Sequence, residues 1–183
     1  MYCGTNKTAL ASQEQISNAL YELMKEKNYS EISVSELCRK AHISRQTFYT
    51  LYQSKENIII KYLQTNIYTP NADISDGQEC STFKLEDFCL QFSRYLISNK
   101  HFLTLLVNNG IIYLLFESMY QSMLACDFFL YHLDEKERRY IAAFIASGFS
   151  GIGQVYIERG AVDTEEFLKV QIGSLFRGEY IPN

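Results

Sequence analysis

The chain has 183 residues, of which 47% are apolar and 21% are charged, and its formal net charge is −4. This composition is that of an ordinary soluble globular protein, with ample length for a core in one large or two small domains. Prolines are scarce, apolar residues recur with helical spacing, and strand-like alternation is rare. We therefore expect an all-α protein.

Cysteine and histidine residues are scattered along the chain, without the spacing of metal ligands. The sequence also lacks a Ser/His/Asp arrangement and a glycine loop that would cradle a phosphate. We therefore expect no metal, no cofactor and no enzymatic activity. Residues 1–11 lack the basic start and apolar stretch of a signal peptide, which favours a reducing cytoplasm as the location.

Residues 140–157 contain no charged side chain and approach the length of about 20 residues that a membrane-spanning helix needs. The stretch nevertheless includes Ser147, Ser150, Gln154 and three glycines. We interpret it as a helix buried on both faces within a protein core, and we expect no membrane partner.

Residues 1–68 form a predicted N-terminal domain. Apolar stripes, caps and polar breaks place its first helix from about Thr8 or Ser12 to Lys27, and the next three at 34–41, 45–52 and 55–68. The next stretch, 69–82, is polar and contains Pro70 and an Asp-Gly pair. We expect it to be a loop that marks the domain boundary.

Residues 83–183 form a predicted C-terminal domain, an antiparallel helical body. Helical periodicity, a stop at Gly110 and caps at Asp134 and Thr164 indicate five helices. Their expected ranges are 83–99, 100–109, 111–131, 135–159 and 165–177.

Three helix starts lie within residues 33–57. Ser33 precedes Glu36 in a capping-box pattern, and Ser44 and Ser54 repeat the N-cap signal. Residues 40–43 leave room only for a tight turn between the first two of these helices. Two short helices joined in this way form a helix-turn-helix, whose second helix can enter the major groove of DNA.

The second helix of this pair has a polar outward face. Phe48, Leu51 and Tyr52 lie at helical spacing and can pack inward. The remaining positions carry Arg, Gln, Thr and Tyr, side chains that bond base edges and phosphate oxygens. We expect Arg45, Gln46 and Thr47 to read bases, with Ser44 and Thr50 nearby.

Net charge is divided unevenly between the two predicted domains. Residues 1–68 contain eight Lys or Arg and six Asp or Glu, whereas residues 69–183 contain nine and fifteen. A mildly basic head on an acidic body fits a small DNA-contacting module on a scaffold that does not touch DNA. Ordinary scatter of charges would give a similar difference.

The stretch Val34–Asn57 resembles the DNA-binding signature of the TetR family of bacterial transcriptional regulators, and the similarity extends over about residues 10–63. The run Phe48–Glu56, with its Phe-Tyr start and Ser-Lys-Glu end, is the most specific part. The sequence departs from the family pattern at His42, where a turn glycine is common, and at Tyr52, where Phe is common. A histidine tolerates positive φ, so the turn is expected to persist.

The resemblance implies phosphate contacts by Tyr49 and Lys55, helped by Ser33 or Ser35. It also implies a homodimer that binds a palindromic double-stranded DNA operator, with repression as the family default. In such proteins the fourth helix links the head to the body, so motion of the body can reset the heads. The complete predicted DNA-binding set is Ser33, Ser35, Ser44, Arg45, Gln46, Thr47, Tyr49, Thr50 and Lys55.

The predicted body is rich in aromatic side chains, which is typical of pockets for small apolar or aromatic effectors. A plain hydrophobic core would have the same composition. Two other kinds of function remain open. The regulator could respond to a partner protein or to thiol oxidation at Cys80 or Cys89, or the protein could be a dimeric interaction module that has lost DNA binding. The candidate pocket residues are Phe88, Phe92, Tyr95, Phe102, Tyr113, Phe116, Tyr120, Phe144 and Phe149.

Small residues recur every four positions in the helix expected at 135–159, which lets another helix approach closely. The family resemblance implies that the last two long helices pair with their copies in a second subunit. Residues 99–106 and 156–160 also resemble, more loosely, one C-terminal subtype of the family. The expected dimer interface comprises Ala143, Ser147, Gly151, Ile152, Phe167, Ile172 and Leu175.

Overall fold

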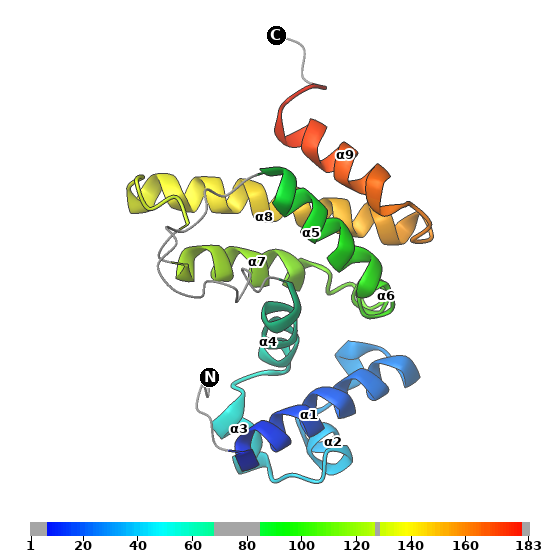
Figure 1. Ribbon diagram of the computed structural model, residues 1–183. Coiled ribbons are helices and arrows are strands. Elements are labelled where there is room, and N and C mark those ends of the chain that lie inside the picture. The colour runs from blue at the N-terminus through cyan, green and yellow to red at the C-terminus, as the bar shows by residue number, and fades with distance from the viewer. Residues whose placement is uncertain (1–6, 68–84, 127–128, 181–183) are drawn as a thin grey trace.

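The computed structural model describes residues 7–67, 85–126 and 129–180, and all regular structure within them is helical. Figure 1 shows a small head at one end of the molecule and a larger body at the other, joined by α4. The head contains α1 (Lys7–Glu26), the 3₁₀ turn η1 (Tyr29–Glu31), α2 (Val34–Lys40), α3 (Arg45–Leu51) and α4 (Lys55–Ile67). The body contains α5 (Leu85–Ser98), α6 (Lys100–Asn108), α7 (Tyr113–Ala125), α8 (Glu135–Glu158) and α9 (Glu165–Phe176).

Helix α1 begins close to Thr8, the earlier of its two expected starts, and the other boundaries agree with the sequence-based expectation to within one or two residues, with one exception. The helix expected at 111–131 ends at Ala125, because Cys126 adopts an extended conformation as its C-cap. The break expected after α1 contains the short turn η1. The loop expected at 69–82 lies outside the described residues.

The predicted caps organise the helix-turn-helix. Ser33 Oγ accepts a hydrogen bond from the backbone N–H of Glu36 at 3.2 Å, and Ser44 Oγ accepts one from Thr47 at 2.9 Å. His42 lies in the turn between α2 and α3 with φ of +54°, as its place in the family pattern predicts. The crossing of α2 and α3 is thus set by local contacts.

The head core anchors α3 through one side only. Phe48 is fully buried, and Leu51 and Tyr52 are 3% and 2% exposed. These side chains join a core built from α1, α2 and α4 that includes Ile16 and Leu37. Because that side is buried, the other side of α3 must face solvent.

The head is held against the body at the turn before α2. The backbone N–H of Tyr29 donates to Asn109 Oδ1 at 2.6 Å, across 80 residues of chain. Asn109 is the C-cap of α6, and its Nδ2 donates to the carbonyl of Leu105 at 2.8 Å. This asparagine therefore connects the end of α6 to the first turn of the head.

Helix α8 is the one helix in the described ranges that is long and apolar enough by itself to cross a membrane. Its inner face packs on the body through the buried residues Ala142, Ala146 and Phe149. The expectation that both faces are buried is wrong, because Phe144 and Val155 are 69% and 52% exposed. One side of α8 is covered by the body and the other is an open apolar surface.

The Phe48→Ala substitution should lower the free energy of unfolding by about 3–5 kcal/mol, because it opens a cavity where α3 is anchored. Gln46→Ala, on the exposed side of the same helix, should change it by less than about 0.5 kcal/mol. Chemical denaturation followed by circular dichroism measures both. Equal effects would contradict the one-sided anchoring of α3.

Candidate nucleic-acid interface

The outward face of α3 gathers most of the residues predicted to contact DNA. Ser44, Arg45, Gln46, Tyr49 and Thr50 are all exposed, and Tyr49 retains 50% of its accessible surface. Figure 1 shows α3 at the opposite end of the molecule from α9. The first helix of the pair adds two hydroxyls, because Ser33 and Ser35 at its start are also exposed.

Local hydrogen bonds decide which of these side chains can reach furthest. Thr47 is half-buried, and its Oγ1 lies 2.8 Å from Ser44 Oγ. Thr50 Oγ1 donates to the carbonyl of Gln46 at 2.9 Å. The hydroxyls thus bond within the head, and the long side chains of Arg45 and Gln46 provide the main reach. Arg can bond guanine and Gln can bond adenine in a bidentate manner.

Tyr49 is positioned by its neighbour in the core. Its ring meets the ring of Phe48 edge to face, with centroids 5.2 Å apart. This contact holds the phenol beside the outward face, where its hydroxyl can donate to a phosphate oxygen.

The structure corrects the role assigned to Lys55. Its Nζ donates to the carbonyl oxygens of Tyr29 at 2.9 Å and Ile32 at 2.5 Å, and lies 4.3 Å from the centre of the Tyr29 ring. The ammonium therefore closes the turn between α1 and α2, and the Lys55 side chain is half-buried. Burial lowers the pKa of Lys55, and the neighbouring carboxylate of Glu56 acts in the opposite direction.

Tyr29 and Glu56 complete this cluster. Tyr29 Oη donates to Glu56 Oε1 at 2.9 Å. Burial and the Glu56 carboxylate raise the pKa of the Tyr29 phenol, so it stays protonated and acts as a donor. Burial alone would raise the pKa of Glu56, but hydrogen bonds from its own backbone, Ser54 and Tyr29 lower it overall. The sequence analysis did not identify Tyr29 as a functional residue, because its partners Glu56 and Asn109 lie 27 and 80 residues away along the chain.

Much of the positive charge of the head is paired internally. Lys27 lies 2.6 Å from Glu36, and Lys40 lies 2.6 Å from Glu26. Arg39 is exposed in the last turn of α2, beside the turn that leads into α3. We add Arg39 as a candidate phosphate contact that the sequence analysis did not name. Its place near the end of α2 could have been predicted by counting from the N-cap at Ser33.

The aromatic side chains proposed as an effector pocket do not line one cavity, so this expectation is wrong. Phe88 and Phe92 pack edge to face on Phe149 at 4.7 and 4.5 Å, as part of the body core. Tyr113 and Phe144 are exposed on the surface. The other members are the buried Tyr95, the half-buried stacked pair Phe116 and Tyr120, and Phe102.

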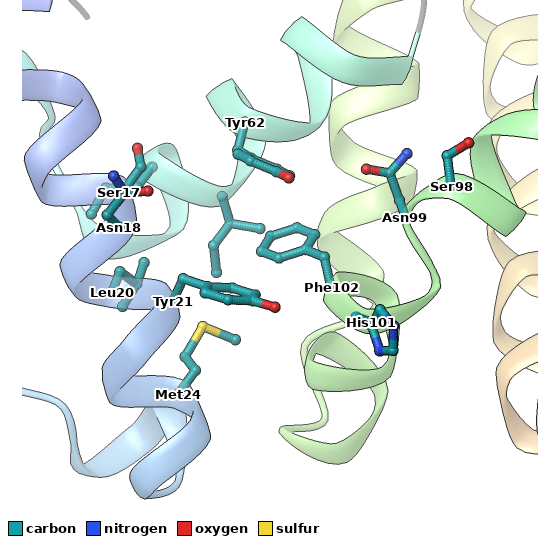
Figure 2. Close-up of a pocket in the computed structure, with 12 residues that line it drawn as sticks. Ser17, Asn18, Leu20, Tyr21, Met24, Tyr62, Ser98, Asn99, His101 and Phe102 are labelled. Atoms are coloured by element: carbon teal, nitrogen blue, oxygen red, sulfur yellow. The ribbon is translucent and has the colours of Figure 1, made fainter.

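A cavity of about 340 Å³ is present at a different place, between the head and the body. Figure 2 shows its walls, which come from α1 and α4 on the head side and from the end of α5 and the start of α6 on the body side. Phe102 is the one residue it shares with the predicted pocket.

The predicted dimer residues are divided between surface and core. Ser147, Gly151, Phe167 and Leu175 are exposed, and Ala143 and Ile152 are partly exposed. Ile172 is fully buried within the subunit, where α9 packs on α5, so its assignment to the dimer surface is wrong. A Cβ added at Gly151 would meet nothing within 4 Å, so this part of α8 is open to a close neighbour.

Thiol control at Cys89 has no support in the structure. Its side chain is 1% exposed, and burial raises the pKa of the thiol, which disfavours the reactive thiolate. Cys80, the other candidate thiol, lies outside the described residues.

The head, with two capped helices crossing at a tight turn and a polar outer face, has the structure of a helix-turn-helix DNA-binding domain. Residues 16–61 match the family model described as "Bacterial regulatory proteins, tetR family". The head is therefore similar to the DNA-binding domain of TetR-family transcriptional regulators, as the sequence resemblance implied.

Three relatives illustrate this relationship. The chain is 25% identical over 168 residues to the transcriptional activator DhaS of the dhaKLM operon from Lactococcus lactis, covering 84% of this chain and 83% of that protein. The structure of Lin0861 from Listeria innocua is similar with a TM-score of 0.77 at 14% identity, over 97% and 95% of the two chains. NalD, a secondary repressor of an efflux pump in Pseudomonas aeruginosa, gives a TM-score of 0.55 at 20% identity, over 94% and 97%.

Replacing Arg45 with Ala should weaken binding to a selected DNA site by about 1–3 kcal/mol and relax the sequence preference, because a bidentate base contact is lost. Fluorescence anisotropy with the selected site and single-base variants measures this. Leu10→Ala, a substitution elsewhere on the head surface, is the control and should leave the preference unchanged. An unaltered preference in Arg45→Ala would remove this residue from the reading set.

The Lys55→Met variant should lose about 1–3 kcal/mol of unfolding free energy, because two turn carbonyls lose their donor. The dependence of log Kd on log salt should stay unchanged when DNA binding is measured at several salt concentrations. Lys61→Met makes the same charge change on α4 and should have little effect on stability. A salt slope that falls by about one in Lys55→Met, with stability intact, would restore Lys55 as a phosphate contact.

Proposed function

We propose that the protein binds a palindromic double-stranded DNA operator as a homodimer, with α3 of each subunit in the major groove, and that a small apolar or aromatic effector controls this binding. The observation that carries the proposal is the exposed polar face of α3, with Arg45 and Gln46 outermost, on a helix whose opposite side is fixed by buried Phe48. A DNA-binding regulator acts in the cytoplasm, which agrees with the location expected from the sequence.

The dimer is supported by the apolar surface that α8 and α9 leave uncovered. Phe144 and Val155 on α8 are exposed, and so are Phe167, Val170 and Leu175 on α9, each by 47% or more. Large exposed apolar side chains gathered on two helices favour an interface there. Two copies facing each other through these helices would form a four-helix bundle, and a two-fold axis in the protein requires a two-fold symmetric operator.

Control by an effector would follow from a shift between two arrangements of head and body. A ligand can change DNA affinity only by the difference in its own affinity for the two arrangements. Repression remains the prediction from the family default. DhaS is named as an activator and NalD as a repressor, so the sign of control is a separate measurement.

Selection of genomic fragments by the purified protein tests the DNA-binding proposal. The expected result is enrichment of an inverted repeat whose half-sites are spaced by about one turn of DNA or a multiple of it. A parallel selection with Arg45→Ala shows whether α3 is responsible. Failure of the wild-type protein to enrich any sequence would favour an interaction module without DNA binding.

The dimer makes a separate prediction. Val155→Asp should weaken self-association at least about tenfold, because a carboxylate would be buried between two apolar helices. DNA affinity should fall with it, since two linked heads bind more tightly than one. Sedimentation velocity at several concentrations measures the association. Leu10→Asp, on an aliphatic side chain of α1 with similar exposure, is the control and should leave the dimer intact. An unchanged dimer in Val155→Asp would place the interface elsewhere.

A further inference from the structure

The cavity at the head–body junction is built around three aromatic rings from three different helices. Phe102, near the start of α6, lies between Tyr62 of α4 and Tyr21 of α1, with ring centroids 4.4 and 6.2 Å away. Figure 2 shows these rings directed into the space between the head helices and the start of α6. The aromatic rings therefore belong to both sides of the junction, and their spacing depends on how the head sits on the body.

The polar atoms of the cavity lie at its edges. Asn99 Nδ2 donates to the carbonyl of Tyr95 at 2.9 Å, which leaves Oδ1 of the same amide as an acceptor. In Figure 2 this oxygen points toward the side of Tyr62 and Phe102, while the nitrogen points away. Ser17 and Asn18 of α1 supply further polar groups at the opposite edge.

Among the described residues, the lining contains no Lys, Arg, Asp or Glu, and its histidine, His101, is exposed. The nearby charge of Lys25, which lies 4.1 Å from the centre of the Tyr21 ring, is matched by Glu22 at 2.7 Å. A charged ligand would lose its hydration here without gaining a buried counter-charge. The cavity chemistry therefore favours an uncharged molecule.

The phenols of Tyr21 and Tyr62 line the cavity, and the carbonyl of Tyr95 accepts the hydrogen bond from Asn99. The neighbouring phenol of Tyr21 contributes to the raised pKa of Tyr62, although burial is the larger cause, and Tyr62 in turn contributes to that of Tyr95. The Tyr95 hydroxyl is buried and has no hydrogen-bond partner within the described part of the chain. Buried hydroxyls without partners are rare, so the Tyr95 hydroxyl has unused hydrogen-bonding capacity.

We propose that this junction cavity is the effector site, and that it takes a small, uncharged, planar aromatic molecule carrying an N–H or O–H donor. The ring of the ligand would stack beside Phe102 and Tyr62, and its donor would bond Asn99 Oδ1. The volume of about 340 Å³ lies at the lower end of the usual range for ligand pockets, which suits a one- or two-ring compound.

Occupancy of this cavity would act directly on the head. The ligand would touch α1 and α4 on one side and the α5–α6 connection on the other, so its affinity depends on their relative position. If DNA changes the affinity for the ligand by some factor, thermodynamic reciprocity requires that the ligand change the affinity for DNA by the same factor. This inference rests on the proposed function for its regulatory readout, whereas ligand binding itself can be measured without DNA.

Indole is a suitable probe, with 4-hydroxyacetophenone as a second donor-bearing aromatic. Ligand-detected NMR on the full-length protein should give a Kd of about 1 mM or tighter for both. 1-Methylindole, which lacks the donor, and indole-3-acetate, which is charged, should each bind at least about fivefold more weakly. Absence of binding by both donor-bearing probes, or equal binding by all four compounds, would overturn the assignment.

Two variants test whether the probe occupies this cavity. Asn18→Trp from the head side and Ser98→Trp from the body side place a large ring in the cavity from exposed positions that should tolerate it. Each should abolish indole binding, whereas Glu14→Trp, one turn earlier on α1 and outside the lining, should retain it. Retention in both cavity variants would place the indole site elsewhere and refute the proposal.

The coupling is read in two ways. At ten times its Kd, indole should slow amide exchange at Tyr29, whose N–H crosses the same junction, by about tenfold if ligand is released when the junction opens. It should also change the DNA Kd at least threefold, in either direction. Indole that binds but leaves both unchanged would refute the coupling. Slowed exchange in a protein that binds no DNA would support the cavity and contradict the proposed function.

Discussion

Burial of Phe48 is the constraint on which the rest of the structure depends. A helix of seven residues has too few internal hydrogen bonds to be stable alone, so its position comes from tertiary packing. The buried ring of Phe48, with Leu51 and Tyr52, fixes α3 on the head core. The same contact determines which side chains face outward, and the polar set that results has the chemistry of a DNA-reading surface.

The contacts between the head and the body share residues, so one of them cannot change without affecting the others. Tyr29 donates its N–H to Asn109 of the body and its hydroxyl to Glu56, while its carbonyl accepts from Lys55. Phe102 enters the same junction beside Tyr21 and Tyr62. Displacement of α6 would therefore disturb the turn before α2 and the base of α4 together. The junction is a physical route by which the body can affect the head.

The sequence specifies what is local, and the structure supplies what is not. Ser33 and Ser44 predicted the helix starts correctly because a capping hydroxyl and the backbone N–H that donates to it lie three residues apart. Lys55 was misassigned because the carbonyls it satisfies lie 23 and 26 residues away. Ile172 was misassigned because periodicity identifies an apolar face without saying which neighbour covers it. The aromatic side chains of the body posed the same difficulty, since core and pocket require similar residues.

The most direct test of the central claim is a map of backbone amide NMR shifts on the protein as a selected DNA fragment is added. The outward face of α3 is proposed to enter the major groove, so the largest changes should fall on residues 44–50, with smaller changes at the start of α2. The amides of α8 and α9 should change little. Changes concentrated on α8 and α9, with residues 44–50 unaffected while DNA is bound, would contradict the account.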